Sequence, residues 1–396
     1  MVNGYRYLRT GYIPPLIRLV AVALLVTGLP LLSVWLTGQP LARYLEFPPL
    51  TSYISHAPFS WAVFLLLAFF IVAVCAPFFF RIVTSLTNNL ESATSSRPLP
   101  WWFFVGIGII LISWFLAWHR FSWFAPFQPY TFLPLWLGYI ITVNALSYHR
   151  SGHCLLVNNR RFFLLLFPLS SLFWWFFEYL NRFVQNWHYL GTENFSPLGY
   201  VIHASLCFST VLPAVLGTEE LLATLPRLTE PLTDLWPVRL KNPVPCGWTV
   251  LIIAALGLAG IGIWPDYLFP LLWIAPLLVI TGLQTVMGEK TIFSPLREGD
   301  WRPIWLPALA ALVCGFFWEM WNSGSLAHWE YSIPFIQRFH IFYMPVLGYA
   351  GYLPFGLECA VMAALFLQGG NQTLESLINK DQKPDKSHCS SSPQPV

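Results

Sequence analysis

The sequence predicts an all-α fold, a polytopic bundle of transmembrane helices, and three observations lead to it. The chain carries few charges, it contains long apolar stretches, and its basic residues fall mostly on one side of those stretches. Of 396 residues, 56% are hydrophobic and only 10% are charged, whereas a soluble domain carries about 25% charged residues. This composition excludes a soluble enzyme, a nucleic-acid-binding domain and a disordered chain.

Ten stretches are long enough to span a membrane. A helix needs roughly 20 apolar residues to cross about 30 Å of hydrocarbon. The apolar runs are continuous rather than alternating, so they predict helices and not strands. Proline inside several of them predicts kinked helices. The ten stretches lie at about 19–37, 59–80, 101–118, 131–148, 162–180, 198–217, 247–264, 267–287, 303–320 and 342–368.

The distribution of basic residues predicts the orientation of the chain. If the N-terminus is inside, 17 of the 21 Lys and Arg residues fall on the inner side, and only Arg43, Arg120, Arg182 and Arg338 fall outside. Loops rich in Lys and Arg remain cytoplasmic. We therefore expect both termini in the cytoplasm and the protein in the inner (plasma) membrane of a bacterium.

The sequence also contains an internal repeat. Segments 177–181 and 318–322 both read aromatic-Glu-x-x-Asn at an offset of 141, and a Trp-x-Tyr follows each of them at an offset of 142. Ordered matches at nearly constant offsets indicate duplication, here as two tandem parallel repeats of four spans each. The expected organisation is a two-span segment at 1–97, repeats at 98–222 and 243–367, and a disordered cytoplasmic tail at 369–396.

Two repeated carboxyl groups are the first candidates for chemistry. Glu178 and Glu319 each lie 17 residues after the basic residue that opens their span, about 25 Å along a helix and near its outer end. Asn181 and Asn322 follow one turn later on the same face. A carboxyl group surrounded by aromatic side chains suits a general acid, so these four are candidate catalytic residues. Two alternatives stay open: ordinary interfacial glutamates, and asparagines that only form helix-end hydrogen bonds.

Glu358 is the fifth candidate catalytic residue. It follows Pro354 within the last span. An acidic side chain inside a membrane is costly and usually functional. The alternative is a solvated position near the cytoplasmic interface.

The Trp-x-Tyr motifs supply the candidate substrate-binding residues, Trp187, Tyr189, Trp329 and Tyr331. The alternative is that they belong to the aromatic belts of membrane interfaces. The chain has no nucleotide-binding or metal-ligand motif, so we expect neither a cofactor nor a metal. The expected partners are the lipid bilayer and a lipid or isoprenoid ligand, without nucleic acid. The sequence does not indicate an oligomeric state.

The order of an acidic residue, Trp-x-Tyr and then Pro-x-x-x-Glu in a repeated unit resembles the small integral-membrane lycopene cyclase domain family. More broadly, the chain is similar to uncharacterised families of polytopic bacterial membrane proteins. The first resemblance implies cyclisation of a polyene by protonation without net redox change. It would place Glu178 or Glu319, together with Glu358, near the proton-donating site. The chain departs from that family in having no Pro-x-Glu-Glu element.

Three functional hypotheses follow from these patterns. The first is an intramembrane protein that binds or processes a lipid or isoprenoid. The second is a proton-coupled transporter or permease, suggested by the parallel repeats, the proline-broken spans and the embedded acids. The third is a structural or assembly protein whose motifs only pack helices together. No helix carries a polar stripe, which favours an apolar ligand over a wide hydrophilic pathway.

Overall fold

The computed structural model describes residues 15–49, 51–85 and 97–368, and most of them are helical. The N-terminal part contains α1 (Pro15–Leu36), α2 (Ala42–Leu45) and α3 (Trp61–Ser85). The middle part contains α4 (Trp101–Trp118), η1 (Ser122–Tyr130), α5 (Phe132–Ser151), α6 (Leu155–Asn158), α7 (Arg160–Val184), β1 (Trp187–Leu190), α8 (Pro197–Phe208), α9 (Val211–Ala223), α10 (Pro226–Thr229) and η2 (Glu230–Leu232). The last part contains α11 (Pro243–Ile261), α12 (Pro265–Leu268), η3 (Phe269–Trp273), α13 (Ala275–Val286), η4 (Ser294–Glu298), α14 (Arg302–Gly324), β2 (His328–Tyr331), β3 (His340–Ile341), β4 (Met344–Pro345), η5 (Val346–Gly351) and α15 (Tyr352–Gln368).

The helices are those of an integral membrane protein. Among the described residues, seven are long and apolar enough to cross a membrane, and the number rises to nine if each of two bent pairs is one span. Nine of the predicted stretches coincide with these elements. The tenth, 19–37, coincides with α1, whose apolar part Val22–Leu36 is shorter. Ten spans therefore remain a prediction, and the predicted tail at 369–396 lies outside the described residues.

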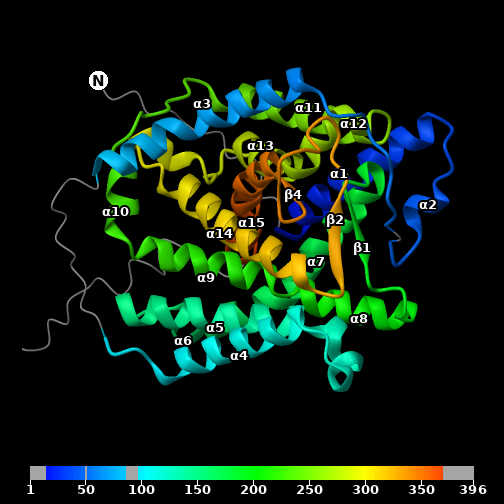
Figure 1. Ribbon diagram of the computed structural model, residues 1–396. Coiled ribbons are helices and arrows are strands. Elements are labelled where there is room, and N and C mark those ends of the chain that lie inside the picture. The colour runs from blue at the N-terminus through cyan, green and yellow to red at the C-terminus, as the bar shows by residue number, and fades with distance from the viewer. Residues whose placement is uncertain (1–14, 50, 86–96, 369–396) are drawn as a thin grey trace, which may run out of the picture.

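The two bent pairs occupy corresponding places in the middle and last parts of the chain. The chain turns by 65° between η1 and α5, and by 56° between η3 and α13. Each bend follows the first long helix of its part, α4 or α11, and that helix packs against the one after the bend. In Figure 1, α4 and α5 lie side by side at the bottom of the view.

Breaks in apolar helices leave backbone groups that need partners inside the protein. At the break between α8 and α9, a side chain supplies the partners for these backbone groups. The Ser170 hydroxyl on α7 donates to the Phe208 carbonyl at 2.6 Å and accepts from the Leu212 N–H at 3.0 Å. One buried side chain thus satisfies both sides of the break.

The strands β1 and β2 form a two-stranded antiparallel sheet with a symmetric register. His188 pairs with Glu330, and Trp187 and Tyr189 pair with Tyr331 and Trp329 respectively. In the repeat, at an offset of 142, His188 corresponds to Glu330, which is also its strand partner. The pair Trp187–Tyr331 corresponds in the same way to the pair Trp329–Tyr189. A local two-fold axis therefore passes through the central pair. The second sheet pairs β3 with β4.

The core lies where α5, α7, α9, α11, α13, α14 and α15 meet. In contrast, α3 runs along the periphery, across the top of the view in Figure 1. Only 6% of its most apolar window is buried in the protein, and its packing partners include η2, α10 and η5. Most of its apolar surface is therefore available to lipid.

The contact between α14 and α15 depends on a glycine. A Cβ added to Gly356 would lie 2.0 Å from the carbonyl oxygen of Pro307. We expect Gly356→Ala to lower the free energy of unfolding by about 1–3 kcal/mol, which outweighs the ~1 kcal/mol that alanine gains in helix propensity. Thermal unfolding in detergent measures the change.

Gly351→Ala is the matched control, because a Cβ there meets no atom within 4 Å. Equal unfolding temperatures for the two variants would contradict the close approach of α14 and α15.

Candidate functional site

The carboxyl group of Glu178 on α7 is completely buried and accepts three hydrogen bonds from aromatic side chains. Its Oε1 accepts from Trp174 Nε1 at 2.9 Å, Trp187 Nε1 at 3.1 Å and the Tyr189 hydroxyl at 2.5 Å. Trp174 lies one turn earlier on α7, and the other two donors come from β1. Its Oε2 has no partner. The structure thus brings together the Glu and the Trp-x-Tyr that the sequence singled out.

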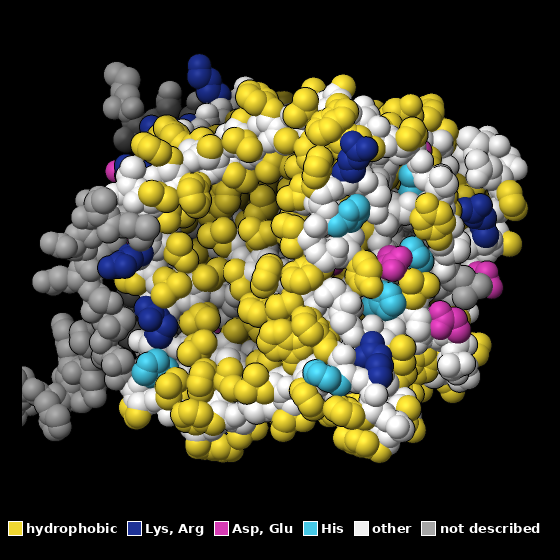
Figure 2. Space-filling view, viewed as in Figure 1, with side chains coloured by type: hydrophobic (Ala, Val, Ile, Leu, Met, Phe, Trp, Pro, Cys, Tyr) yellow, Lys and Arg dark blue, Asp and Glu magenta, His cyan; other side chains and the backbone are white. Residues whose placement is uncertain are grey.

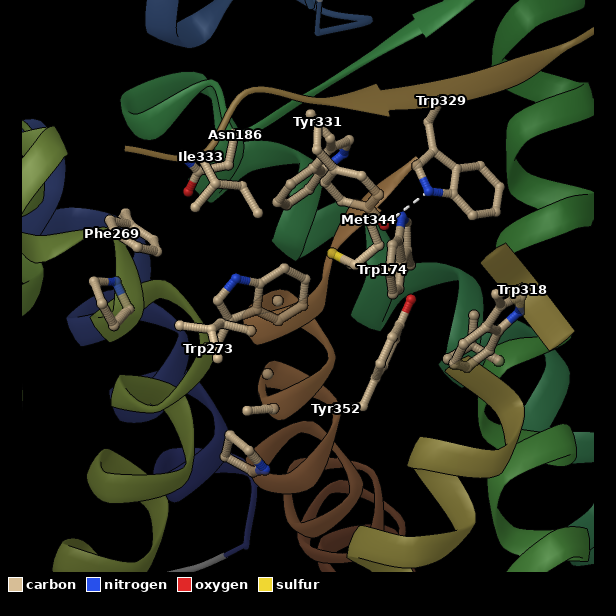
Figure 3. A pocket seen from close by; sticks show the side chains of 18 of the residues that line it. Trp174, Asn186, Phe269, Trp273, Trp318, Trp329, Tyr331, Ile333, Met344 and Tyr352 are labelled. Atoms are coloured by element: carbon tan, nitrogen blue, oxygen red, sulfur yellow. Dashed lines mark hydrogen bonds between the residues drawn. The ribbon is translucent and has the colours of Figure 1, made fainter. Parts of the chain in front are cut away.

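The carboxyl group of Glu319 on α14 has a similar set of partners. Its Oε1 accepts from the hydroxyl groups of Tyr331 at 2.7 Å and Tyr352 at 2.6 Å. Trp329 Nε1 donates to the Tyr331 oxygen at 2.8 Å, the bond drawn as a dashed line in Figure 3. Oε2 is again buried without a partner. A chain of donors therefore leads from β2 to this carboxyl.

The two candidate asparagines join helix ends to strands. Asn181 Nδ2 donates to the Trp187 carbonyl and its Oδ1 accepts from the Asn186 N–H, both at 2.8 Å. Asn322 bonds both the carbonyl and the N–H of Trp329, at 2.7 and 2.8 Å. These are the helix-end hydrogen bonds that the sequence left open as an alternative. Through them each asparagine holds its Trp-x-Tyr strand against the carboxyl of its own half.

In both halves an extra aromatic side chain donates to the buried carboxyl, but a different helix supplies it in each half. At the offset of 141, Trp174 corresponds to Gly315 and Val211 corresponds to Tyr352. A Cβ on Gly315 would lie 2.4 Å from the Tyr352 ring, so this ring lies directly against the glycine. In the first half the extra donor to the carboxyl comes from α7 itself. In the second half it comes from α15, and the small residue on α14 makes room for it.

Glu358 on α15 is buried as well but has a different partner. Its Oε1 accepts from the Leu277 N–H at 3.2 Å, in the first turn of α13, where N–H groups have no acceptor within the helix. The side chain therefore caps the helix that follows a bend, and the helix dipole favours an acidic group there. The structure does not bring Glu358 into either aromatic cluster. Among the described residues, no Lys or Arg forms an ion pair with Glu178, Glu319 or Glu358.

A cavity of about 470 Å³ lies between the two clusters, which we call the aromatic cavity. Figure 3 shows aromatic rings from both halves around it, and Figure 2 shows hydrophobic side chains lining a hollow below α3. Its described lining contains no Asp, Glu, Lys or Arg. Glu178 and Glu319 stand behind the aromatic donors that form its wall. These aromatic wall residues include Trp174, Trp187, Tyr189, Phe269, Trp273, Trp318, Trp329, Tyr331 and Tyr352.

The phenols of Tyr189 and Tyr331 belong to strands and line this cavity. Burial raises the pKa of both hydroxyls well above the ordinary value, and the neighbouring carboxyl of Glu178 or Glu319 raises it further. Both phenols therefore stay protonated over the physiological pH range and remain hydrogen-bond donors.

Most of the cavity residues escaped the sequence analysis, and Tyr352, Trp273 and Asn186 are three examples. Tyr352 corresponds to a valine in the first repeat, so comparing the repeats gives no sign of it. Trp273 ends the short 3-10 helix η3 just before the second bend, and Asn186 lies just beyond α7. No sequence motif marks either of them, because their position in the cavity depends on contacts between distant segments.

Comparison with known proteins finds no matching family model, no similar curated protein and no similar solved structure. The class of this chain, an integral membrane protein of helical bundle type, follows from its own helices and composition.

The first half has Trp174 and Val211 where the second half has Gly315 and Tyr352. We therefore expect substitutions at Gly315 and Tyr352 to have coupled effects on stability. We expect Gly315→Ala to destabilise the protein by about 1–3 kcal/mol, because the new methyl group meets the Tyr352 ring. In a Tyr352→Val background the same substitution should cost at least ~1 kcal/mol less. A double-mutant cycle of chemical denaturation in detergent measures this coupling.

Gly108→Ala on α4 is the control, because a Cβ there meets no atom within 4 Å and its effect should be the same in both backgrounds. If Gly315→Ala cost the same free energy of unfolding in the two backgrounds, Gly315 would not be what makes room for the Tyr352 ring.

Proposed function

We propose that this membrane protein binds, and through its buried acids processes, a lipid or isoprenoid molecule in the aromatic cavity. The observation that carries the proposal is the cavity itself. It is about 470 Å³ in volume, within the range of roughly 300–1,000 Å³ for small-molecule sites. Its described lining is mostly aromatic and aliphatic, with a few polar side chains such as Asn186, Thr192 and His203 but no Asp, Glu, Lys or Arg. Such walls favour an apolar ligand over an ion or a sugar.

The position of α3 supports entry from the bilayer. Leu67, Phe70, Ile71 and Val74 of this helix line the cavity, while most of its other apolar surface is exposed. This peripheral helix thus forms a wall of the cavity on a side that would face the hydrocarbon of the membrane. A ligand dissolved in the bilayer would reach the site by passing beside α3.

The chemistry that we propose for processing is proton transfer. The side chains of Tyr189 and Tyr331 line the cavity, and their hydroxyls donate to Glu178 and Glu319 respectively. For this transfer the glutamic acid must be protonated and donate to the tyrosine oxygen, while the phenol gives its own proton to a carbon of an unsaturated ligand. The carbocation then closes a ring and returns a proton through the phenol to the carboxylate, so that no proton is consumed. This is the reaction that the resemblance to the lycopene cyclase domain family implies, and it needs no cofactor.

We also propose that residues 98–222 and 243–367 are parallel duplicates. The corresponding bends, the symmetric register of β1 and β2 and the matching Asn–strand hydrogen bonds support this origin. Four spans in each half would give the two halves one orientation, and α1 as a tenth span would put both termini on the same side of the membrane. The excess of basic residues on one side supports a bacterial inner membrane with both termini in the cytoplasm.

The transporter hypothesis has less support. Its coupling residue would be Glu358, but that side chain bonds the Leu277 N–H and is not among the cavity residues. The hypothesis of a purely structural protein predicts no bound ligand, and the following tests separate it from lipid binding.

Filling the cavity should expel its ligand. Ala350 on η5 lines the cavity, and we expect Ala350→Phe to reduce the amount of co-purifying lipid several-fold, because the ring occupies part of the volume. Mass spectrometry of extracts from the purified protein measures the lipid. Ala62→Phe on the exposed surface of α3 is the control. Equal lipid in the wild type and both variants would contradict a binding role for the cavity.

Removing both acids tests processing separately from binding. We expect cells that express the Glu178→Gln, Glu319→Gln double variant to lose the change in lipid profile that the wild type causes, because glutamine accepts hydrogen bonds but does not supply a proton. Lipid mass spectrometry measures the profile at equal membrane levels of the two proteins.

Glu193→Gln, in the loop after β1, is the control for this experiment. A profile change that persists in the double variant would rule out the two carboxyls as the source of the proton.

A further inference from the structure

One face of α8 turns towards the aromatic cavity. Its cavity residues follow helical spacing, at Tyr200, His203, Ala204, Cys207 and Phe208. The opposite face carries Leu198, Ile202 and Leu206, which are all exposed. One face therefore points into the cavity and the other towards lipid. The hydroxyl and imidazole groups of the cavity face belong to Tyr200 and His203, in the first two turns, so the cavity has a polar end at the beginning of α8.

The Tyr200 hydroxyl is open to the cavity. It forms no hydrogen bond with another described residue, and unlike Asn186 Oδ1 it is not one of the unbonded polar atoms that the protein encloses completely. Burial raises the pKa of Tyr189, and the nearby Glu178 and Tyr200 raise it further, which places the Tyr200 phenol on the inner side of α8. The hydroxyl of Thr192, another lining residue, is unbonded and open in the same sense.

The imidazole of His203 is held in place beside Tyr200. Its ring stacks on Phe195 with 5.1 Å between the ring centroids, and Tyr130 meets it edge-on at 5.0 Å. Its Nε2 has only a weak contact, 3.7 Å from the Cys207 sulfur. Side chains three residues apart are neighbours on a helix. Tyr200 and His203 therefore form one polar cluster whose rings are positioned by packing.

The second half of the chain has no matching open hydroxyl. The sequence Leu-Gly-Tyr at 198–200 recurs at 347–349. There the Tyr349 hydroxyl donates to the Ile341 carbonyl at 3.1 Å, and Tyr349 is not among the described lining residues. The polar cluster is thus confined to the first half of a cavity with aromatic walls from both halves.

Most other polar side chains of the described lining are already bonded. The amide of Asn186 donates to the Ser332 carbonyl and its oxygen is enclosed, and His328 Nδ1 lies 3.0 Å from the Leu326 carbonyl oxygen. The side chains that donate within the two carboxyl clusters are Trp174, Trp187, Tyr189, Trp329, Tyr331 and Tyr352.

The polar groups that stay open in this lining share one property, the ability to donate. The indole N–H groups of Trp273 and Trp318 have no partner among the described residues, and an indole only donates. The hydroxyls of Thr192 and Tyr200 and a neutral imidazole can each donate as well, and the thiols of Cys75 and Cys207 are weak donors. No open side chain of the described lining is restricted to accepting. The cavity therefore suits a ligand that brings an acceptor.

We propose that the ligand is an apolar molecule with a carbonyl group, and that the carbonyl oxygen accepts hydrogen bonds from Tyr200 and His203. This inference rests on the proposed function and names the chemical class of its ligand. A carbonyl oxygen has two lone pairs and no proton, so it can accept from both donors at once. A charged headgroup would lack an Asp, Glu, Lys or Arg partner in the described lining. Because the cluster lies in one half only, the ligand binds in one orientation, with its apolar part against the aromatic walls.

The test compares farnesyl acetone with the hydrocarbon in which a methylene group replaces its carbonyl. Each compound displaces a brominated hydrocarbon that quenches the cavity tryptophans of the purified full-length protein in detergent. Partition into detergent is the same for every variant, so the ratio of the two affinities reports on the site. We expect Tyr200→Phe to lower the preference for the ketone about two- to tenfold, the size of one net hydrogen bond. Adding His203→Phe should lower it further.

Tyr349→Phe is the matched control, because it removes the hydroxyl of the other Leu-Gly-Tyr and should leave the preference unchanged. An unchanged affinity for the hydrocarbon in each variant shows that the cavity is intact. If Tyr200→Phe keeps the wild-type preference, or Tyr349→Phe lowers it equally, the carbonyl inference is wrong while lipid binding stands. If neither compound displaces the brominated hydrocarbon from the wild type, the proposed function itself fails for ligands of this class.

Discussion

The hydrogen bonds that aromatic side chains donate to two buried carboxyl groups organise the centre of this protein. Glu178 and Glu319 lie in apolar surroundings where water does not satisfy them, so their partners must come from the protein. Those partners are tryptophan and tyrosine side chains, which bring a polar atom and a large apolar ring together. The polar atom turns towards the carboxyl and the ring turns towards the cavity. Satisfying each acid thereby also builds an apolar wall.

The two halves meet this requirement without being identical. The first half uses Trp174 from the helix that carries the acid, and the second uses Tyr352 from the last helix, which lies against Gly315. A donor to each carboxyl is preserved although the residue and the helix that supply it differ. The cavity between the halves is therefore nearly symmetric in its aromatic walls but asymmetric in its polar atoms. One example is Asn186, whose counterpart is His328, with its Nδ1 3.0 Å from the Leu326 carbonyl oxygen.

Glu358 shows that a buried acid in a membrane helix can serve as the hydrogen-bond acceptor for a backbone N–H group. The bend before α13 frees N–H groups at the start of that helix, and Glu358 accepts from one of them. Ser170 does the same for both sides of the break between α8 and α9. Broken spans require such side chains because lipid offers no hydrogen bonds. This distinguishes the role of Glu358 from that of the two acids behind the aromatic cavity.

The sequence by itself determined the helical membrane class, because apolar length and the lack of charge are local properties of the chain. It also singled out Glu178 and Glu319 together with their Trp-x-Tyr partners, since the motif recurs at a nearly constant spacing. Only the tertiary structure decided what these residues do. Four-residue strands are too short to be recognised from the sequence, and their pairing joins segments about 140 residues apart. Tyr352, Trp273 and Asn186 reach the cavity through similar long-range contacts. The direction of each side chain depends on which distant atom satisfies it, and no local pattern specifies that atom.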